Sequence, residues 1–185
     1  MDALAEALKN GSITLAQWEA GMRDIIREEF TNAMIAAKGG REFVTQSDWG
    51  YLGSLLKKQY QYLHNFAADI AKNPEAWMNG RLDARMALYQ KASYSAFQEM
   101  VRREHIENGY TDERRVLGVA DHCPGCLQQA SLGWQPIGTL DPIGAEECNM
   151  NCQCEFEYRK TGEETDMLFT PGLEMDMLFA PAEVE

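Results

Sequence analysis

The chain has 185 residues, 45 % of them hydrophobic, so it is long enough for one ordinary domain with a small satellite and apolar enough to bury a core. No apolar run approaches the roughly 18 residues that cross a bilayer, and Met1–Leu4 lacks the basic start of a secretion signal, so the sequence predicts a soluble, unsecreted protein with no membrane partner. The formal charge of −12 disfavours a stand-alone DNA-binding protein, because affinity for DNA comes largely from Lys and Arg.

Residues 1–109 have the pattern of a helical domain. A short helix is expected over residues 3–9, and a second begins at the capping pair Thr14 and Gln17 and ends at Gly39-Gly40. A third starts near Ser47 and stops at Asn73-Pro74, and the fourth and longest ends at Asn108-Gly109. The residues that recur at helical spacing and predict a packed core are Leu15, Trp18, Met22, Ile25, Phe30, Met34, Trp49, Leu52, Leu56, Leu63, Phe66, Ile70, Met78, Leu82, Met86, Tyr89, Ser93, Phe97 and Met100.

The charged side chains and histidines between these positions are interpreted as surface residues without a role in binding or catalysis. Lys57-Lys58 and Arg102-Arg103 are predicted to form a solvated face. His64 and His105 are interpreted as surface or capped residues rather than ligands. No chemistry is therefore assigned to the helices.

Residues 110–160 have a different character and are predicted to form a separate module. A strand is expected over residues 114–119 and another over 155–158, with an irregular, Gly- and Pro-rich insert between them that excludes long helices. Units of this size bury too little apolar surface to be stable alone and usually need a metal ion or disulfides.

All five cysteines of the chain lie in this module, at Cys123, Cys126, Cys148, Cys152 and Cys154. Cys123 and Cys126 form a C-x2-C pair, and the other three follow after 21 intervening residues, a spacing typical of structural Zn²⁺ bound by four thiolates. The first choice of ligands is Cys123, Cys126, Cys152 and Cys154, with Cys148 as the alternative to Cys152 and His122 as an outside candidate.

Two interpretations without a metal compete with zinc: disulfides and unrelated buried cysteines. A reducing cytosol and an odd number of cysteines disfavour disulfides. Unrelated buried cysteines are hard to reconcile with five thiols inside 32 residues.

A catalytic zinc site is the other alternative. His105 and Glu107, followed by Cys123 and Cys126, faintly echo the pattern of zinc deaminases. However, the proline lies inside the cysteine pair, whereas in deaminases it precedes the pair. The further cysteines would also complete the coordination of the ion, and a catalytic zinc needs one position for water. The zinc is therefore predicted to be structural, and no residue is assigned as catalytic.

Several segments of the module together resemble a known family. They are residues 110–117, 121–126, 133–140, 142–144 and 151–158, and the most specific are Asp121-His-Cys-Pro-Gly-Cys126 and Asn151-Cys-Gln-Cys154. About 50 residues are similar to the C-terminal part of phage head morphogenesis proteins, minor head proteins related to the F protein of phage Mu.

The resemblance implies a virion component that is made in the host bacterial cytoplasm and incorporated into the phage head in multiple copies. It implies a place near the portal, contacts with the portal or the major capsid protein and with packaged DNA, and a role in capsid assembly. The alternative function is a zinc-containing nucleic-acid-binding module for DNA packaging or delivery, with contacts from Arg114, Arg115, Arg159 and Lys160.

Residues 161–185 form an acidic tail with seven acidic residues and no Lys or Arg. The motif Asp-Met-Leu-Phe-x-Pro occurs twice in it, ten residues apart. One interpretation is a solubilising tail, and the preferred one is a pair of docking motifs, because such tails normally lack apolar clusters. The docking residues are Asp166, Met167, Leu168, Phe169 and Pro171 in the first copy and Asp176, Met177, Leu178, Phe179 and Pro181 in the second. The predicted class is therefore mainly α with a small β module: a helical bundle, a zinc-stapled β-hairpin unit and an extended tail.

Overall fold

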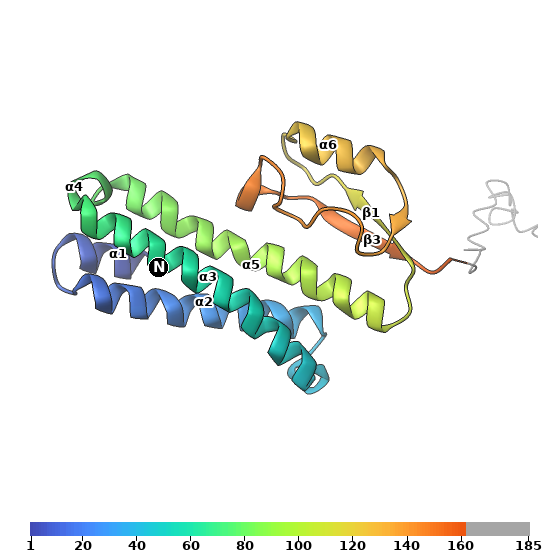
Figure 1. Cartoon of the computed structure of the whole chain (residues 1–185), viewed down its shortest axis with the longest axis horizontal. Coiled ribbons are helices and arrows are strands. Elements are labelled where there is room, and N and C mark those ends of the chain that lie inside the picture. Colours follow the sequence, from blue (N-terminus) through green and yellow to red (C-terminus); the bar gives the residue numbers. More distant parts are fainter. Residues whose placement is uncertain (162–185) are drawn as a thin grey trace, which may run out of the picture.

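The structure, a computed structural model, describes residues 1–161 as a helical bundle with a small sheet packed beside its longest helix (Figure 1). The bundle contains α1 (Asp2–Lys9), α2 (Leu15–Ala37), the 3-10 turn η1 (Arg41–Phe43), α3 (Gln46–Lys72), α4 (Pro74–Trp77) and α5 (Gly80–Glu107). The module contains β1 (Asp112–Val116), α6 (Pro124–Ser131), β2 (Gln135–Pro136), η2 (Asn149–Asn151) and β3 (Glu155–Arg159). The predicted class, mainly α with a small β module, is confirmed; the tail motifs lie outside the described residues.

Local capping signals set the starts of the long helices. Thr14 and Gln17 form the expected capping box at the start of α2, and Thr45 and Asp48 form a second one before α3. The fourth predicted helix is interrupted, because the Asn79 side chain accepts a hydrogen bond from the Arg81 amide at 2.9 Å and starts α5 anew.

The three long helices α2, α3 and α5 share one core, although three of the predicted core positions are displaced by one residue. Ile26 is buried in place of Ile25, and Ala92 and Ala96 are buried in place of Ser93 and Phe97. Phe97 instead lies beside Tyr94, with ring centroids 6.5 Å apart, so small alanines face the bundle. Trp49, also predicted in the core, is 36 % exposed. The buried core consists of Ala5, Leu8, Trp18, Met22, Ile26, Phe30, Met34, Leu52, Leu63, Phe66, Ala67, Ile70, Leu82, Met86, Tyr89, Ala92, Ala96 and Met100.

A cluster of charges closes one end of this bundle. The Lys38 side chain, 5 % exposed, lies 3.4 Å from the fully buried Asp48 and also pairs with Glu104 and Glu107. Arg103, whose side chain is 31 % exposed, adds a contact to Asp48 at 3.4 Å, so it is only partly on the predicted solvated face. Lys57 and Lys58 are exposed, as predicted.

The cluster shifts the pKa of its carboxyl groups. Burial raises the pKa of Asp48, but hydrogen bonds from Thr45 and the charge of Lys38 outweigh burial and hold that pKa below its ordinary value. The hydrogen bond from Lys38 lowers the pKa of Glu104 in the same way. Groups with a lowered folded-state pKa contribute stability above their unfolded pKa, near pH 4, and lose it as the pH falls through the folded value.

Lys38→Met is therefore expected to destabilise the bundle by about 3 kcal/mol at neutral pH, because it leaves buried carboxylates without their cation. The difference from wild type should shrink as the pH falls through the lowered folded-state pKa values of Asp48 and Glu104, because protonation removes the buried charges that Lys38 compensates. Urea denaturation followed by circular dichroism across this range measures it, with the exposed Lys57→Met as control. Protonation of the cysteines at low pH affects wild type and variant alike and cancels in the comparison. A difference in unfolding free energy between them that does not change with pH would contradict the role assigned to Lys38.

The module is a three-stranded antiparallel sheet in the order β2-β1-β3, with Arg115 opposite Phe156. The first strand starts two residues earlier than predicted, and the second predicted strand is present as β3. The helix α6 was not predicted, because its eight residues are too few for a clear periodic pattern. Cys123 and Pro124 start it, and Gly133, with φ of 65°, follows its end.

Arg102 joins the module to α5. Its side chain is 8 % exposed; Nε lies 2.9 Å from Glu113 Oε2 and Nη2 donates to the Leu140 carbonyl at 3.1 Å. The prediction that Arg102 belongs to a solvated face is therefore wrong, because the module covers that face. His105, of the same helix, stacks on Tyr158 with ring centroids 4.0 Å apart, and its Nδ1 lies 2.8 Å from the Val101 carbonyl oxygen. His64 lies at the surface, as predicted, with a side chain 68 % exposed.

None of the helices within residues 1–161 has the length and apolar character that a membrane crossing requires.

Candidate metal centre

The five cysteines come from three places in the module. Cys123 caps the start of α6 and Cys126 lies in its first turn, Cys148 and Cys152 flank η2, and Cys154 directly precedes β3. All are free thiols, and Cys126, Cys152 and Cys154 are buried. Folding thus gathers the thiols that the sequence places up to 31 positions apart.

The thiols form two overlapping triads that share Cys126. In each triad, Cys123–Cys126–Cys148 and Cys126–Cys152–Cys154, the sulfurs lie within 4.8 Å of one another. Cys126 Sγ is 3.5 Å from Cys148 Sγ and 3.6 Å from Cys152 Sγ. Ligand sulfurs of tetrahedral zinc, at about 2.3 Å from the ion, lie about 3.8 Å apart, so the cluster has the spacing of a metal-binding site. Cys148 approaches Cys126 as closely as Cys152 does, so both belong to the candidate donor set.

His122, the outside candidate, lies beside the second triad. Its Nδ1 is 3.8 Å from Cys154 Sγ, and its Nε2 is 2.9 Å from the Gly118 carbonyl. With the proton on Nε2 donated to that carbonyl, Nδ1 keeps its lone pair, an arrangement typical of metal-binding histidines.

The electrostatics of the cluster favour a bound cation. Burial raises the pKa of Cys126, and burial also raises that of Cys148, to about 12. The Cys126 amide, by contrast, donates a hydrogen bond that lowers the pKa of Cys123. Buried thiols hold their protons unless a positive charge compensates the thiolate, and metal ions provide that compensation while protons are released.

Arg115 supplies part of the positive charge and supports the surrounding loop. It is 3 % exposed, its Nη1 lies 3.4 Å from Cys126 Sγ, and it donates to the carbonyls of Asp141 and Pro142. Because Arg115 is buried, its prediction as a nucleic-acid contact is wrong. No signal in the sequence distinguished it from its exposed neighbour Arg114.

The backbone approaches closely around the cysteines. A Cβ at Gly125 would collide with the Glu146 carboxylate, and one at Gly118 would collide with the Gln153 carbonyl. Tyr94 of α5 donates from its hydroxyl to the Cys154 carbonyl at 3.0 Å, so α5 also fixes the cysteine segment. Gly118 meets backbone, which cannot move aside for a side chain, whereas at Gly125 the obstacle is the end of a flexible glutamate side chain.

The other predicted nucleic-acid contacts surround an aromatic ring. The guanidinium groups of Arg114 and Arg159 lie 4.8 and 4.6 Å from the ring centre of Trp134. Arg114 donates to Glu157 at 2.7 Å, and Arg159 lies 3.8 Å from Asp112. Local acids therefore compensate both charges. Lys160 lies apart, 5.3 Å from the Tyr110 ring centre.

The residues that echoed a deaminase have partners away from the thiols. Glu107 pairs with Lys38 at 3.2 Å and with Arg103 at 3.1 Å at the end of the bundle. His105 is held between Tyr110 and Tyr158. Neither belongs to either cysteine triad.

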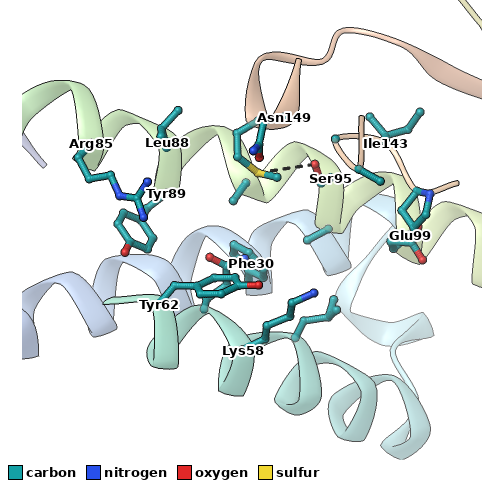
Figure 2. Close-up of a pocket in the computed structure, with 18 residues that line it drawn as sticks. Phe30, Lys58, Tyr62, Arg85, Leu88, Tyr89, Ser95, Glu99, Ile143 and Asn149 are labelled. Atoms are coloured by element: carbon teal, nitrogen blue, oxygen red, sulfur yellow. Dashed lines mark hydrogen bonds between the residues drawn. The ribbon is translucent and has the colours of Figure 1, made fainter. Parts of the chain in front are cut away.

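A cavity of about 470 Å³ lies on the bundle, between α3, α5 and the segment of residues 142–150 (Figure 2). Sequence reasoning missed it, because its walls come from four segments far apart in the chain: α3, α5, residues 142–150 and Phe30 of α2.

Comparison of the chain with known protein families, with curated proteins and with solved structures found no match. The functional assignment therefore rests on the residues of the chain itself.

Proposed function

We propose that this chain is a minor head protein of a phage, a structural and non-enzymatic component of the virion that acts in head assembly near the portal. The observation that supports it is the gathering of the five cysteines around Cys126. These cysteines include the ones in the two motifs, residues 121–126 and 151–154, that carry the resemblance to phage head morphogenesis proteins.

In this proposal four of the five cysteines provide thiolate ligands for one structural Zn²⁺ ion; the five candidates are Cys123, Cys126, Cys148, Cys152 and Cys154. Bound there, zinc would cross-link α6, η2 and the start of β3, which have little apolar core of their own. Five thiolates for four positions leave no place for a reacting water, so the site fits a structural role better than a catalytic one.

The junction between module and bundle supports a static role. The Arg102–Glu113 pair and the stack of His105 on Tyr158 hold the sheet against α5. The partners proposed are the portal and the major capsid protein.

A nucleic-acid-binding module for packaging or delivery remains the second candidate, favoured by the arrangement of Arg114 and Arg159 over Trp134. Alternating cations and aromatic rings are typical of surfaces that bind single-stranded nucleic acid.

Purified particles of the phage that encodes this chain test the proposal. We expect the chain in several copies per particle by quantitative mass spectrometry, and at the portal vertex by immunogold labelling. Cys126→Ser should lower its incorporation at least about tenfold, because the module then loses its metal, whereas Gln128→Ser, an exposed change on α6, should not.

Absence of the chain from particles would overturn the proposal. Normal incorporation of Arg114→Ala/Arg159→Ala, together with particles that lack DNA, would favour the nucleic-acid alternative.

A further inference from the structure

The cavity on the bundle is a groove with apolar walls. Its apolar lining includes Phe30, Leu55, Tyr62 and Leu88 from the bundle, with Ile143 and Met150 from the cysteine module. Its volume, about 470 Å³, is in the range of ordinary ligand pockets, about 300 to 1,000 Å³.

The polar groups of the groove favour an acidic ligand. Lys58 of α3 and Arg85 of α5 reach it from both sides (Figure 2), and neither forms an ion pair with any residue in the range 1–161. The one carboxylate in the lining, Glu99, is 3.4 Å from Arg102 and 3.4 Å from the Tyr51 hydroxyl. The groove therefore presents two cations and no free acid.

A buried hydroxyl in the groove also lacks a partner. Tyr89 is 5 % exposed, and its hydroxyl forms no hydrogen bond within the described part of the chain. Buried hydroxyl groups nearly always have a partner, because leaving one unpaired costs about 1–3 kcal/mol. Figure 2 shows the Tyr89 ring beside the Arg85 guanidinium, so a ligand bound to Arg85 would lie close to Tyr89.

We propose that the second tail motif of the same chain, residues 176–181, binds in this groove. Its apolar residues Met177, Leu178 and Phe179 match the apolar walls. Asp176 supplies the carboxylate that Lys58 and Arg85 lack, in a tail with seven acidic residues and no basic one. This inference does not depend on the role in phage heads.

The length of the tail selects the second motif over the first. Tyr158 stacks on His105, and Arg85, the α5 cation of the groove, lies twenty positions before His105, about 30 Å along the helix. Asp166 follows Thr161 by five residues and reaches at most about 18 Å, whereas Asp176 follows it by fifteen and reaches about 50 Å. A motif tethered this way has an effective concentration in the millimolar range, which favours its own groove over that of another copy.

Photo-crosslinking in the full chain tests the proposal. With a benzophenone amino acid in place of Phe179, we expect cross-links to residues 55–62 and 85–99, identified by mass spectrometry. The same probe at Phe169 is the matched control and should give at least about fivefold less. A mixture of ¹⁵N-labelled and unlabelled chains distinguishes links within a chain from links between chains.

Charge reversal provides the second arm. Lys58→Glu/Arg85→Glu should lower the Phe179 cross-link about tenfold, and Asp176→Lys in that background should restore it. Lys57→Glu/Arg81→Glu, which reverses exposed charges beside the groove, should leave the yield unchanged.

The proposal would be overturned by cross-links outside the groove or by cross-links that form only between chains. A Phe179 cross-link yield that does not change on charge reversal would also overturn it. If the charge-reversed variant does not fold, a free peptide of residues 174–181 is added to the chain that carries the Phe179 probe and the original Lys58 and Arg85. Competition by the peptide for the Phe179 cross-link supports the assignment. No competition at a peptide concentration about tenfold above the effective concentration of the tethered motif contradicts it.

Discussion

Cys126→Ser is expected to reduce bound metal from one ion per chain to less than about a tenth of that and to unfold the cysteine module. Cys126 is the only cysteine that belongs to both triads, and it is 1 % exposed. Losing this thiolate removes the shared donor, and in small metal-held modules the free energy of metal binding is also the free energy of folding. Elemental analysis of the purified chain measures the metal, and limited proteolysis between residues 110 and 160 measures the unfolding.

The other cysteines provide graded controls. Cys148→Ser and Cys154→Ser each change one triad only, and five thiols are available for four positions, so we expect these variants to retain metal with weakened affinity. Affinity should rise with pH in wild type, because thiols with a raised pKa, such as Cys126, must lose their protons to bind. A Cys126→Ser chain that keeps one ion would show that the shared position is not a ligand.

Arg102→Met is expected to lower the free energy of unfolding by about 3 to 5 kcal/mol, because it leaves the fully buried Glu113 without its cation. Burial already raises the pKa of Glu113, and Arg102 opposes that shift, so the variant raises the pKa further. A carboxyl group with a raised folded-state pKa does not lower the free energy of unfolding below its unfolded pKa, near about 4.3. It lowers that free energy progressively as the pH rises above this value. The loss measured by urea denaturation should therefore be larger at about pH 8 than at about pH 5.

A matched variant and a double variant test this explanation. Arg81→Met, an exposed arginine on the same helix, should cost less than about 0.5 kcal/mol. Arg102→Met/Glu113→Met removes both charges and should recover much of the loss, since an apolar pair of similar volume replaces a buried ion pair at small cost. Equal losses in the single and double variants would exclude the ion pair as the cause.

Much of the helical fold was predictable from local chemistry. The capping box at Thr14, the glycines after α2 and the Asn73-Pro74 stop act within one helical turn, so a sequence shows them directly. The choice between Ala92 and Ser93 as core residue was not predictable, because both continue a helical stripe and only the packing of α5 in the shared core of the bundle decides between them.

The buried arginines show why part of the site could not be predicted. Arg102 and Arg115 have neighbours of the same type, Arg103 and Arg114, and nothing local distinguishes the members of each pair. Only the docking of the sheet on α5 buries Arg102, and only the loop at Asp141 and Pro142 buries Arg115. The cysteines were predictable, because the spacing of thiols along the chain is itself the signal.

The segment between Cys148 and Cys152 belongs to two sites at once. Asn149 and Met150 line the groove, while the cysteines on either side of them belong to the metal-binding triads. Met150 also meets Ser95 of α5 at 4.0 Å, the contact drawn in Figure 2. Binding energies at two sites that order the same few residues are thermodynamically linked, and the linkage is reciprocal. Metal bound by the cysteines is therefore expected to change the affinity of the groove for its ligand, and a bound ligand is expected to change the affinity for metal by the same factor.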